Sequence, residues 1–183
     1  MAYYFFDFRD TQKQHRCGLL SSFLSQLSAE SDPCYRILSR LYSAHGGGTK
    51  QPSDDVLSQC LIEMLEVQGR PAVYVIIDAL DECPNISEMP TAREKVLEFL
   101  EDLVNLQLPN VHICVSSRPE IDIRISLKPL APYHVSLDEE SGQKADIRRY
   151  INSVVHSDRM MRRWSAEDKQ LVIDTLSEKA GGM

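Results

Sequence analysis

The sequence of 183 residues lacks three features that would each indicate a class of protein: paired cysteines, long apolar runs and an excess of basic residues. Its five cysteines are odd in number and include no Cys-x-x-Cys pair, which argues against a zinc site and a disulfide framework. No apolar run approaches the ~18 residues of a membrane span. The aromatic start of the chain also lacks the basic leader of a signal peptide. We therefore expect a cytoplasmic protein with no membrane contact.

The charge balance is acidic, with 27 Asp and Glu against 20 Lys and Arg, a net charge of −7. Nucleic-acid-binding domains usually carry a basic face, so we expect no nucleic-acid partner. The chain also lacks the Gly-x-Ser-x-Gly turn of an α/β hydrolase, which disfavours that class of enzyme. Hydrophobic residues make up 43% of the sequence, enough to build a core.

Short apolar segments alternate with amphipathic ones along the first 136 residues. The short segments predict strands, at 2–8, 72–77, 111–115 and 133–137. The amphipathic segments predict helices, at 17–27, after the N-cap Ser53 and after the capping box Thr91-x-x-Glu94, with one short helix at 35–42. This alternation is typical of an α/β fold with a parallel sheet. Because the run at 72–77 is continuously apolar, we expect helices on both faces of the sheet.

The pattern changes near residue 137, after which only helices are expected. Apolar residues recur at helical spacing over 145–155, and Ser165-x-x-Asp168 predicts a capped helix after it. The sequence therefore predicts two parts, an α/β core over 1–136 and a helical region over 137–183.

Polar side chains follow two of the predicted strands. One strand ends in Asp78-Ala-Leu-Asp81-Glu82 and the next in Ser116-Ser117-Arg118. In an open parallel sheet, ligands bind beyond the carboxyl ends of the strands, so these groups should meet in one crevice. Carboxylates hold a hard cation such as Mg²⁺, and an arginine stabilises phosphate charge. The sequence thus predicts a site for a magnesium nucleotide.

These segments resemble a known family of signalling proteins. The run Asp78-Ala-Leu-Asp-Glu-Cys83 resembles the Walker B segment of NACHT-type (STAND) P-loop NTPases, above all the nephrocystin-like N-terminal NTPase domains of fungal receptor proteins. The run Ile113-Cys-Val-Ser-Ser-Arg-Pro-Glu120 resembles their sensor segment, and Tyr3-Tyr-Phe-Phe-Asp7-Phe resembles their second strand. The resemblance covers essentially the whole chain, with 137–183 as the start of a helical lid region.

The resemblance implies a role for each strand-end residue. Asp78 would hold Mg²⁺, and either Asp81 or Glu82 would be the acidic group that orients the attacking water. Ser117 and Arg118 would bind the nucleotide, ATP or GTP, with Arg118 at the terminal phosphate. Hydrolysis would act as a switch between signalling states. Protein partners or self-assembly would involve domains outside these residues.

The family's phosphate-binding loop, Gly-x-x-x-x-Gly-Lys-Ser/Thr, does not occur in these residues. It belongs after the family's first strand, before the strand that starts here at Ala2. The glycine-rich stretch at 45–50 has neither this residue order nor a strand before it, and indicates a surface loop. In the family's strand order 5-1-4-3-2, the missing strand would leave a gap with unpaired backbone groups. We therefore expect the 183 residues alone to bind nucleotide weakly and to be marginally stable.

Two hypotheses follow for the function. The first is a part of a nucleotide-dependent signalling switch. The alternative is a non-catalytic interaction or scaffold fragment, derived from an NTPase but without nucleotide binding.

Overall fold

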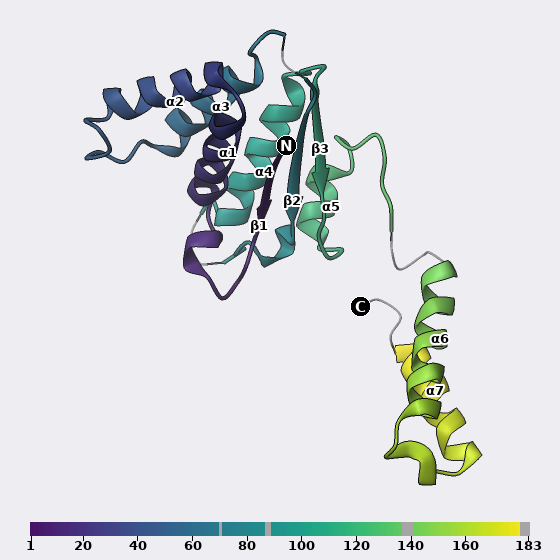
Figure 1. Cartoon of the computed structure of the whole chain (residues 1–183). Coiled ribbons are helices and arrows are strands. Elements are labelled where there is room, and N and C mark those ends of the chain that lie inside the picture. Colours follow the sequence, from purple (N-terminus) through teal and green to yellow (C-terminus); the bar gives the residue numbers. More distant parts are fainter. Residues whose placement is uncertain (70, 87–88, 137–140, 180–183) are drawn as a thin grey trace. The chain divides into compact units, whose positions relative to one another are not determined.

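The computed structural model describes residues 1–69, 71–86, 89–136 and 141–179 (Figure 1). The chain divides into two compact units, residues 1–132 and residues 133–183. Each unit has its own packed interior and is described by itself.

The first unit is built on a three-stranded parallel sheet with the order β1-β2-β3. The strands are β1 (Ala2–Phe5), β2 (Val73–Asp78) and β3 (Val111–Val115). Phe5 pairs with Asp78, and Ile77 pairs with Val115, so the carboxyl ends of all three strands lie at one edge of the sheet. This confirms the predicted α/β fold with a partial parallel sheet.

Five α-helices follow and connect these strands: α1 (Arg16–Glu30), α2 (Asp32–Ala44), α3 (Asp54–Leu65), α4 (Ala92–Asn105) and α5 (Ile121–Leu127). In Figure 1, α1 and α4 lie beside the sheet, and α2 and α3 pack on α1. Their apolar faces form one core with one face of the sheet. The helix caps predicted from the sequence are present, since Ser53 accepts from Val56 N–H and Thr91 and Glu94 form a capping box.

The described helices cover only one face of the sheet, although helices were expected on both. Side chains alternate between buried and exposed along the strands: Tyr4 and Val75 are buried, whereas Tyr3, Phe5 and Tyr74 are about half exposed. The strand order explains this result. A right-handed crossover places its helices on a face set by the direction of the move, and both crossovers here move the same way across the sheet.

The two edges of the sheet differ. On β1, the Gln26 side chain accepts a hydrogen bond from Tyr3 N at 3.0 Å and donates one to Tyr3 O at 2.8 Å, which pairs both backbone polar groups of Tyr3 at this edge. Beside β3, the described part of the chain supplies no further strand.

Two expectations about local structure need correction, and one helix was not expected. The strand predicted at 133–137 is wrong over 133–136, where the backbone is irregular and Tyr133 is exposed; residue 137 lies outside the described residues. The short helix predicted at 35–42 is longer, because Pro33 lies in the first turn of α2, where a proline without an N–H is tolerated. Helix α5 was not predicted at all.

The second unit contains two packed helices, α6 (Ser141–Ser157) and α7 (Ala166–Lys179), with a 3₁₀ turn, η4 (Met161–Arg163), between them. Val155 and Ile173 are buried, and Arg148 pairs with Asp174 at 2.6 Å. This agrees with the helical character expected after residue 137, whereas a lid role stays a prediction. None of the helices in the described ranges is both long enough and apolar enough to cross a membrane.

Candidate functional site

The ends of β2 and β3 are joined by polar contacts around Asp78. Its Oδ1 atom accepts hydrogen bonds from the Ser116 hydroxyl and, at 3.0 Å, from Ala79 N. Ala79 N also lies 3.2 Å from Ser116 Oγ, and Leu80 N donates to Ser116 O at 3.1 Å. Ser116 therefore fixes the start of the acidic turn, residues 78–82, against the neighbouring strand.

The acidic turn itself depends on an unusual backbone conformation. Ala79 is left-handed, with φ 54° and ψ 46°, a region that costs a non-glycine residue roughly 1–2 kcal/mol. The turn continues as a 3₁₀ helix, η2 (Leu80–Glu82), whose Leu80 side chain is fully buried. The sharp bend at Ala79 sends Leu80 into the core, which anchors Asp81 and Glu82 directly beyond the strand end.

Asp81 contacts the segment after β3. Arg118 N donates to Asp81 Oδ1 at 2.9 Å, and Arg118 Nε lies 3.4 Å from Asp81 Oδ2. The Asp81 side chain is 11% exposed and that of Arg118 is 80% exposed. Asp81 is thus engaged through both carboxylate oxygens, whereas most of the Arg118 guanidinium faces solvent and is accessible to an anionic ligand.

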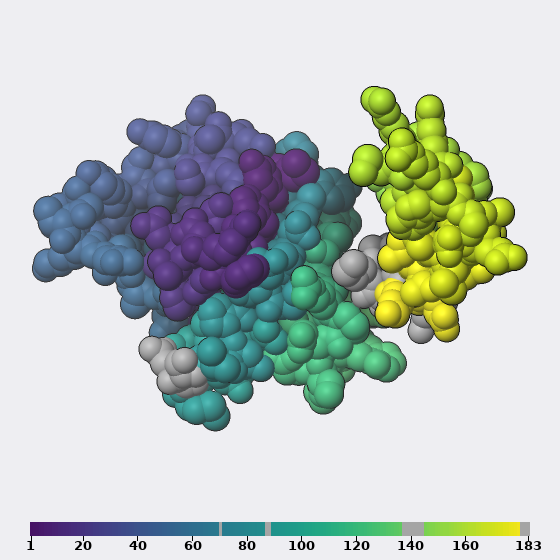
Figure 2. Space-filling view, turned by 90° about the horizontal axis from the view of Figure 1, so that it is seen from below, coloured from purple at the N-terminus to yellow at the C-terminus, as the bar shows by residue number. Residues whose placement is uncertain are grey.

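Glu82 contacts the loop after β1 instead. Its Oε2 accepts a hydrogen bond from Phe8 N at 3.2 Å, and no contact of Oε1 is present among the described residues. The loop after β1 is held from behind by Gln14, whose amide donates to Phe8 O at 2.6 Å. Figure 2 looks at the molecule from below and shows the segments after β1, β2 and β3, purple, teal and green, meeting on one surface.

Ser117 lies beside this cluster without joining it. Its hydroxyl donates to Arg118 O at 2.8 Å, a local contact within the turn. The serine that faces Asp78 is Ser116, which the sequence placed at the strand end but could not distinguish from its neighbour. A nucleotide contact of Ser117 stays a prediction.

Two ionisable groups next to the cluster have shifted pKa values. Burial raises the pKa of the Cys83 thiol to about 12, so this cysteine remains protonated and is unsuited to nucleophilic chemistry. A hydrogen bond from the Arg9 side chain lowers the pKa of Asp7 to about 2, with the pair 2.9 Å apart. Asp7 therefore stays ionised in all physiological conditions, and Arg9 satisfies its charge.

The residues present suit Mg²⁺ bound through one carboxylate together with phosphate oxygens and water. Within the described ranges, no three His, Cys, Asp or Glu side chains form a cluster that could cage an ion. Asp78 is exposed, and its Oδ2 atom has no contact among the described residues. One carboxylate beside a serine hydroxyl is a hard-oxygen donor set, and Mg²⁺ commonly binds through one or two carboxylates together with phosphate oxygens and water.

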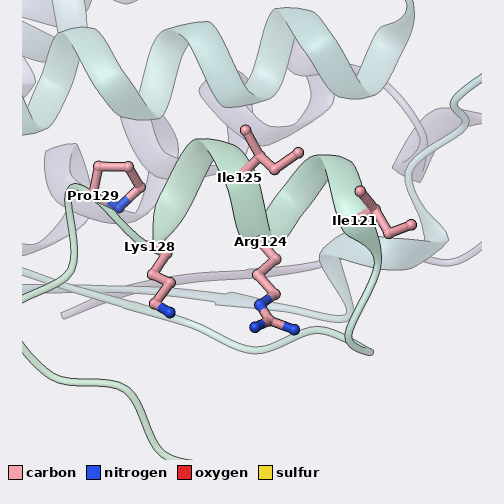
Figure 3. Close-up of a pocket in the computed structure, with 5 residues that line it drawn as sticks. All are labelled: Ile121, Arg124, Ile125, Lys128 and Pro129. Atoms are coloured by element: carbon pink, nitrogen blue, oxygen red, sulfur yellow. The ribbon is translucent and has the colours of Figure 1, made fainter.

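A hollow on the surface lies along α5 (Figure 3). It is lined by Ile121, Arg124, Ile125, Lys128 and Pro129. None of the strand-end residues lines it, and it is formed by a single helix and the turn that follows. The candidate site is therefore the polar cluster at the strand ends, and this hollow is a separate feature.

Comparison with known proteins gives one match. The family model described as "Nephrocystin 3, N-terminal" matches residues 1–118, which include all three strands and end at Arg118. No curated protein and no solved structure matched the chain. Because the matched region spans more than half of the sequence and contains the whole strand-end cluster, the chain belongs to the nephrocystin 3 N-terminal family.

Proposed function

We propose that the strand-end cluster is the metal and terminal-phosphate side of a Mg²⁺–ATP or Mg²⁺–GTP site in a nucleotide-dependent signalling switch. One observation carries the proposal: Asp78 contacts Ser116, and Asp81 contacts Arg118, across the carboxyl ends of neighbouring parallel strands. That edge is where open α/β sheets bind their ligands. The same residues lie within residues 1–118, the part of the chain that the family model matches.

In this proposal Asp78 holds the cation through its Oδ2 atom or through a bound water. The contacts from Ser116 and Ala79 occupy Oδ1 and fix the orientation of the carboxylate, so the direction of Oδ2 is fixed too. When bound, Mg²⁺ would neutralise charge on the phosphate oxygens.

Arg118 and Glu82 take the other two roles. The Arg118 guanidinium is exposed while its backbone is held by Asp81, so the side chain can turn towards a phosphate without moving the segment. The Asp81 side chain is 11% exposed and stays bound to the Arg118 backbone N–H, whereas Glu82 retains Oε1 for a water molecule. This difference favours Glu82 over Asp81 as the group that orients water.

An NMR titration tests the proposal on the chain as it exists. Because the phosphate-binding loop is not among these 183 residues, we expect weak binding, with a Kd of about 1 mM or more. Adding Mg²⁺–ATP or Mg²⁺–GTP to ¹⁵N-labelled protein should shift the amide signals of Ala79 and Arg118. Asp78→Asn should abolish the shifts. The matched control Asp102→Asn, at an exposed aspartate on α4, should leave them unchanged.

The second hypothesis, a scaffold without nucleotide binding, is favoured by the open face of the sheet. Tyr3, Phe5 and Tyr74 are about half exposed there, and exposed aromatic side chains on a sheet are common at protein interfaces. The titration separates the two hypotheses. Signals that do not move with either nucleotide, or that move equally in Asp78→Asn, would reject the nucleotide-dependent switch. The scaffold without nucleotide binding would then be the remaining hypothesis.

A further inference from the structure

Arg93 is a buried arginine directly behind the acidic turn. It lies in the first turn of α4, and its side chain is 8% exposed. Its Nε donates to Cys83 O at 2.9 Å, and Nη2 donates to Asp81 O at 2.6 Å. Its third nitrogen, Nη1, lies 3.1 Å from Asp122 Oδ2, on α5. All three guanidinium nitrogens therefore have an acceptor.

This position is unfavourable for an arginine unless the contacts compensate. The first turn of a helix carries a partial positive charge, which repels a cation. Burying the guanidinium removes it from water, at a cost that only good geometry and full hydrogen bonding offset. The planar fork of arginine supplies that geometry here, since it reaches two backbone carbonyls and a carboxylate at once. Lysine has no such fork.

The contacts of Arg93 join the two segments that make up the candidate site. On one side it holds the carbonyl of Asp81, whose side chain binds Arg118. On the other side it holds Asp122, in the helix that begins directly after the Arg118 segment. Asp122 is itself fixed by Asn85, whose amide donates to Oδ2 at 3.0 Å.

We propose that Arg93 is a positioning residue for the nucleotide site. It sets the distance between the acidic turn and the start of α5, so that Asp81 meets the backbone N–H of Arg118 and leaves the guanidinium exposed. Its effect on nucleotide binding rests on the function proposed above. Its effect on the contact between Asp81 and Arg118 does not, and it can be measured without nucleotide.

The test is amide hydrogen exchange in Arg93→Lys, which keeps the positive charge and loses the fork. Exchange at Arg118 N–H should become up to about tenfold faster, because the hydrogen bond to Asp81 is weakened. Exchange in the middle of α4, at Leu100, should change less than about twofold. The matched control is Arg16→Lys, at a second largely buried arginine, which donates to Ser58 and contacts neither Asp81 nor Asp122 among the described residues. It should leave Arg118 unchanged.

A second variant, Asp122→Asn, keeps the test decisive if Arg93→Lys fails to fold. It weakens one of the three contacts, so Arg118 exchange should accelerate in the same direction but less. Unchanged exchange at Arg118 in the folded variants would overturn the proposal. So would a rise of equal size at Arg118 and Leu100, since that result describes a general loss of stability.

The nucleotide titration of the same variants then separates the two claims. Faster Arg118 exchange together with weaker nucleotide-induced shifts supports both the positioning role and the site. Faster exchange in a protein whose wild type shows no nucleotide response supports the positioning role and rejects the proposed function.

Discussion

Replacing Gly18 by alanine should destabilise the first unit, although the same change stabilises most helices. Gly18 is the third residue of α1, and the helix interior normally favours alanine over glycine by about 1 kcal/mol. Here a Cβ atom would lie 2.4 Å from Gln12 O and 2.8 Å from the Tyr4 hydroxyl oxygen. The nearer atom belongs to the backbone, so no side-chain rotation relieves the contact.

The size of the effect follows from these two opposing terms. Overpacking a well-packed site costs about 1–3 kcal/mol, and a backbone obstacle places this site in the upper part of that range. After subtracting the gain in helix propensity, we expect a net loss of about 1–2 kcal/mol in the free energy of unfolding. For a chain of this size, that loss lowers Tm by about 2–8 °C.

Thermal and urea unfolding followed by circular dichroism measure the change. Ser25→Ala is the matched control, since Ser25 is an exposed residue of the same helix and should gain a few tenths of a kcal/mol from propensity alone. If Gly18→Ala is as stable as the wild type, or more stable, the close approach of α1 to the segment after β1 is refuted. That segment leads to Gln14, which supports the Phe8 contact with Glu82.

Two further predictions concern the surroundings of the acidic turn. Burial raises the pKa of Cys83 from 9.0 to about 12, so its contribution to stability is complete below pH 9 and is lost as pH rises towards 12. In urea denaturation, Cys83→Ala should therefore reduce the decline of the free energy of unfolding above pH 9, by up to about 1.4 kcal/mol per pH unit; an unchanged slope would contradict a buried thiol. Thr91→Ala should cost about 1 kcal/mol, because the hydroxyl caps α4 by accepting from Glu94 N, and Thr91→Ser should retain most of that stability. Equal stability of the two Thr91 variants would argue against the cap.

The sequence predicted secondary structure correctly where a residue pattern was compatible with only one type of element. The continuous apolar run before Asp78 predicted β2, and the spacing of Thr91 and Glu94 predicted the start of α4. Both patterns are local, and tertiary packing reinforced them. The polar residues after two strands then predicted which edge of the sheet carries the site, because parallel strands end together.

Local patterns failed where packing decided between alternatives. In α5, Ile121, Ile123, Ile125 and Leu127 alternate with polar residues, a period typical of a strand, yet the segment is helical and buries only Ile123 fully. The segment at 133–136 also alternates, but no described strand lies beside it. A strand requires a neighbouring strand, and the sequence of a segment does not show whether one is present.

In the candidate site, too, the sequence did not predict which individual side chains contact one another. The sequence predicted that Asp78 and the serine pair lie at one edge of the sheet, but only the hydrogen bond from the Ser116 hydroxyl shows that Ser116, and not Ser117, faces Asp78. Arg93 could not be found from sequence, because its contacts run to Asp81, 12 residues earlier, and to Asp122, 29 residues later. An arginine in the first turn of a helix, against the helix dipole, is the one local sign of its role.

If a divalent cation with its nucleotide binds at Asp78, paramagnetic Mn²⁺ should reveal it. Mn²⁺ accepts the same oxygen ligands as Mg²⁺ and broadens the NMR signals of nearby amides. With Mn²⁺–ATP or Mn²⁺–GTP, we expect broadening centred on Ala79 and residues 116–118, and its loss in Asp78→Asn. Broadening centred elsewhere, or unchanged in Asp78→Asn, would show that the cation does not bind at Asp78.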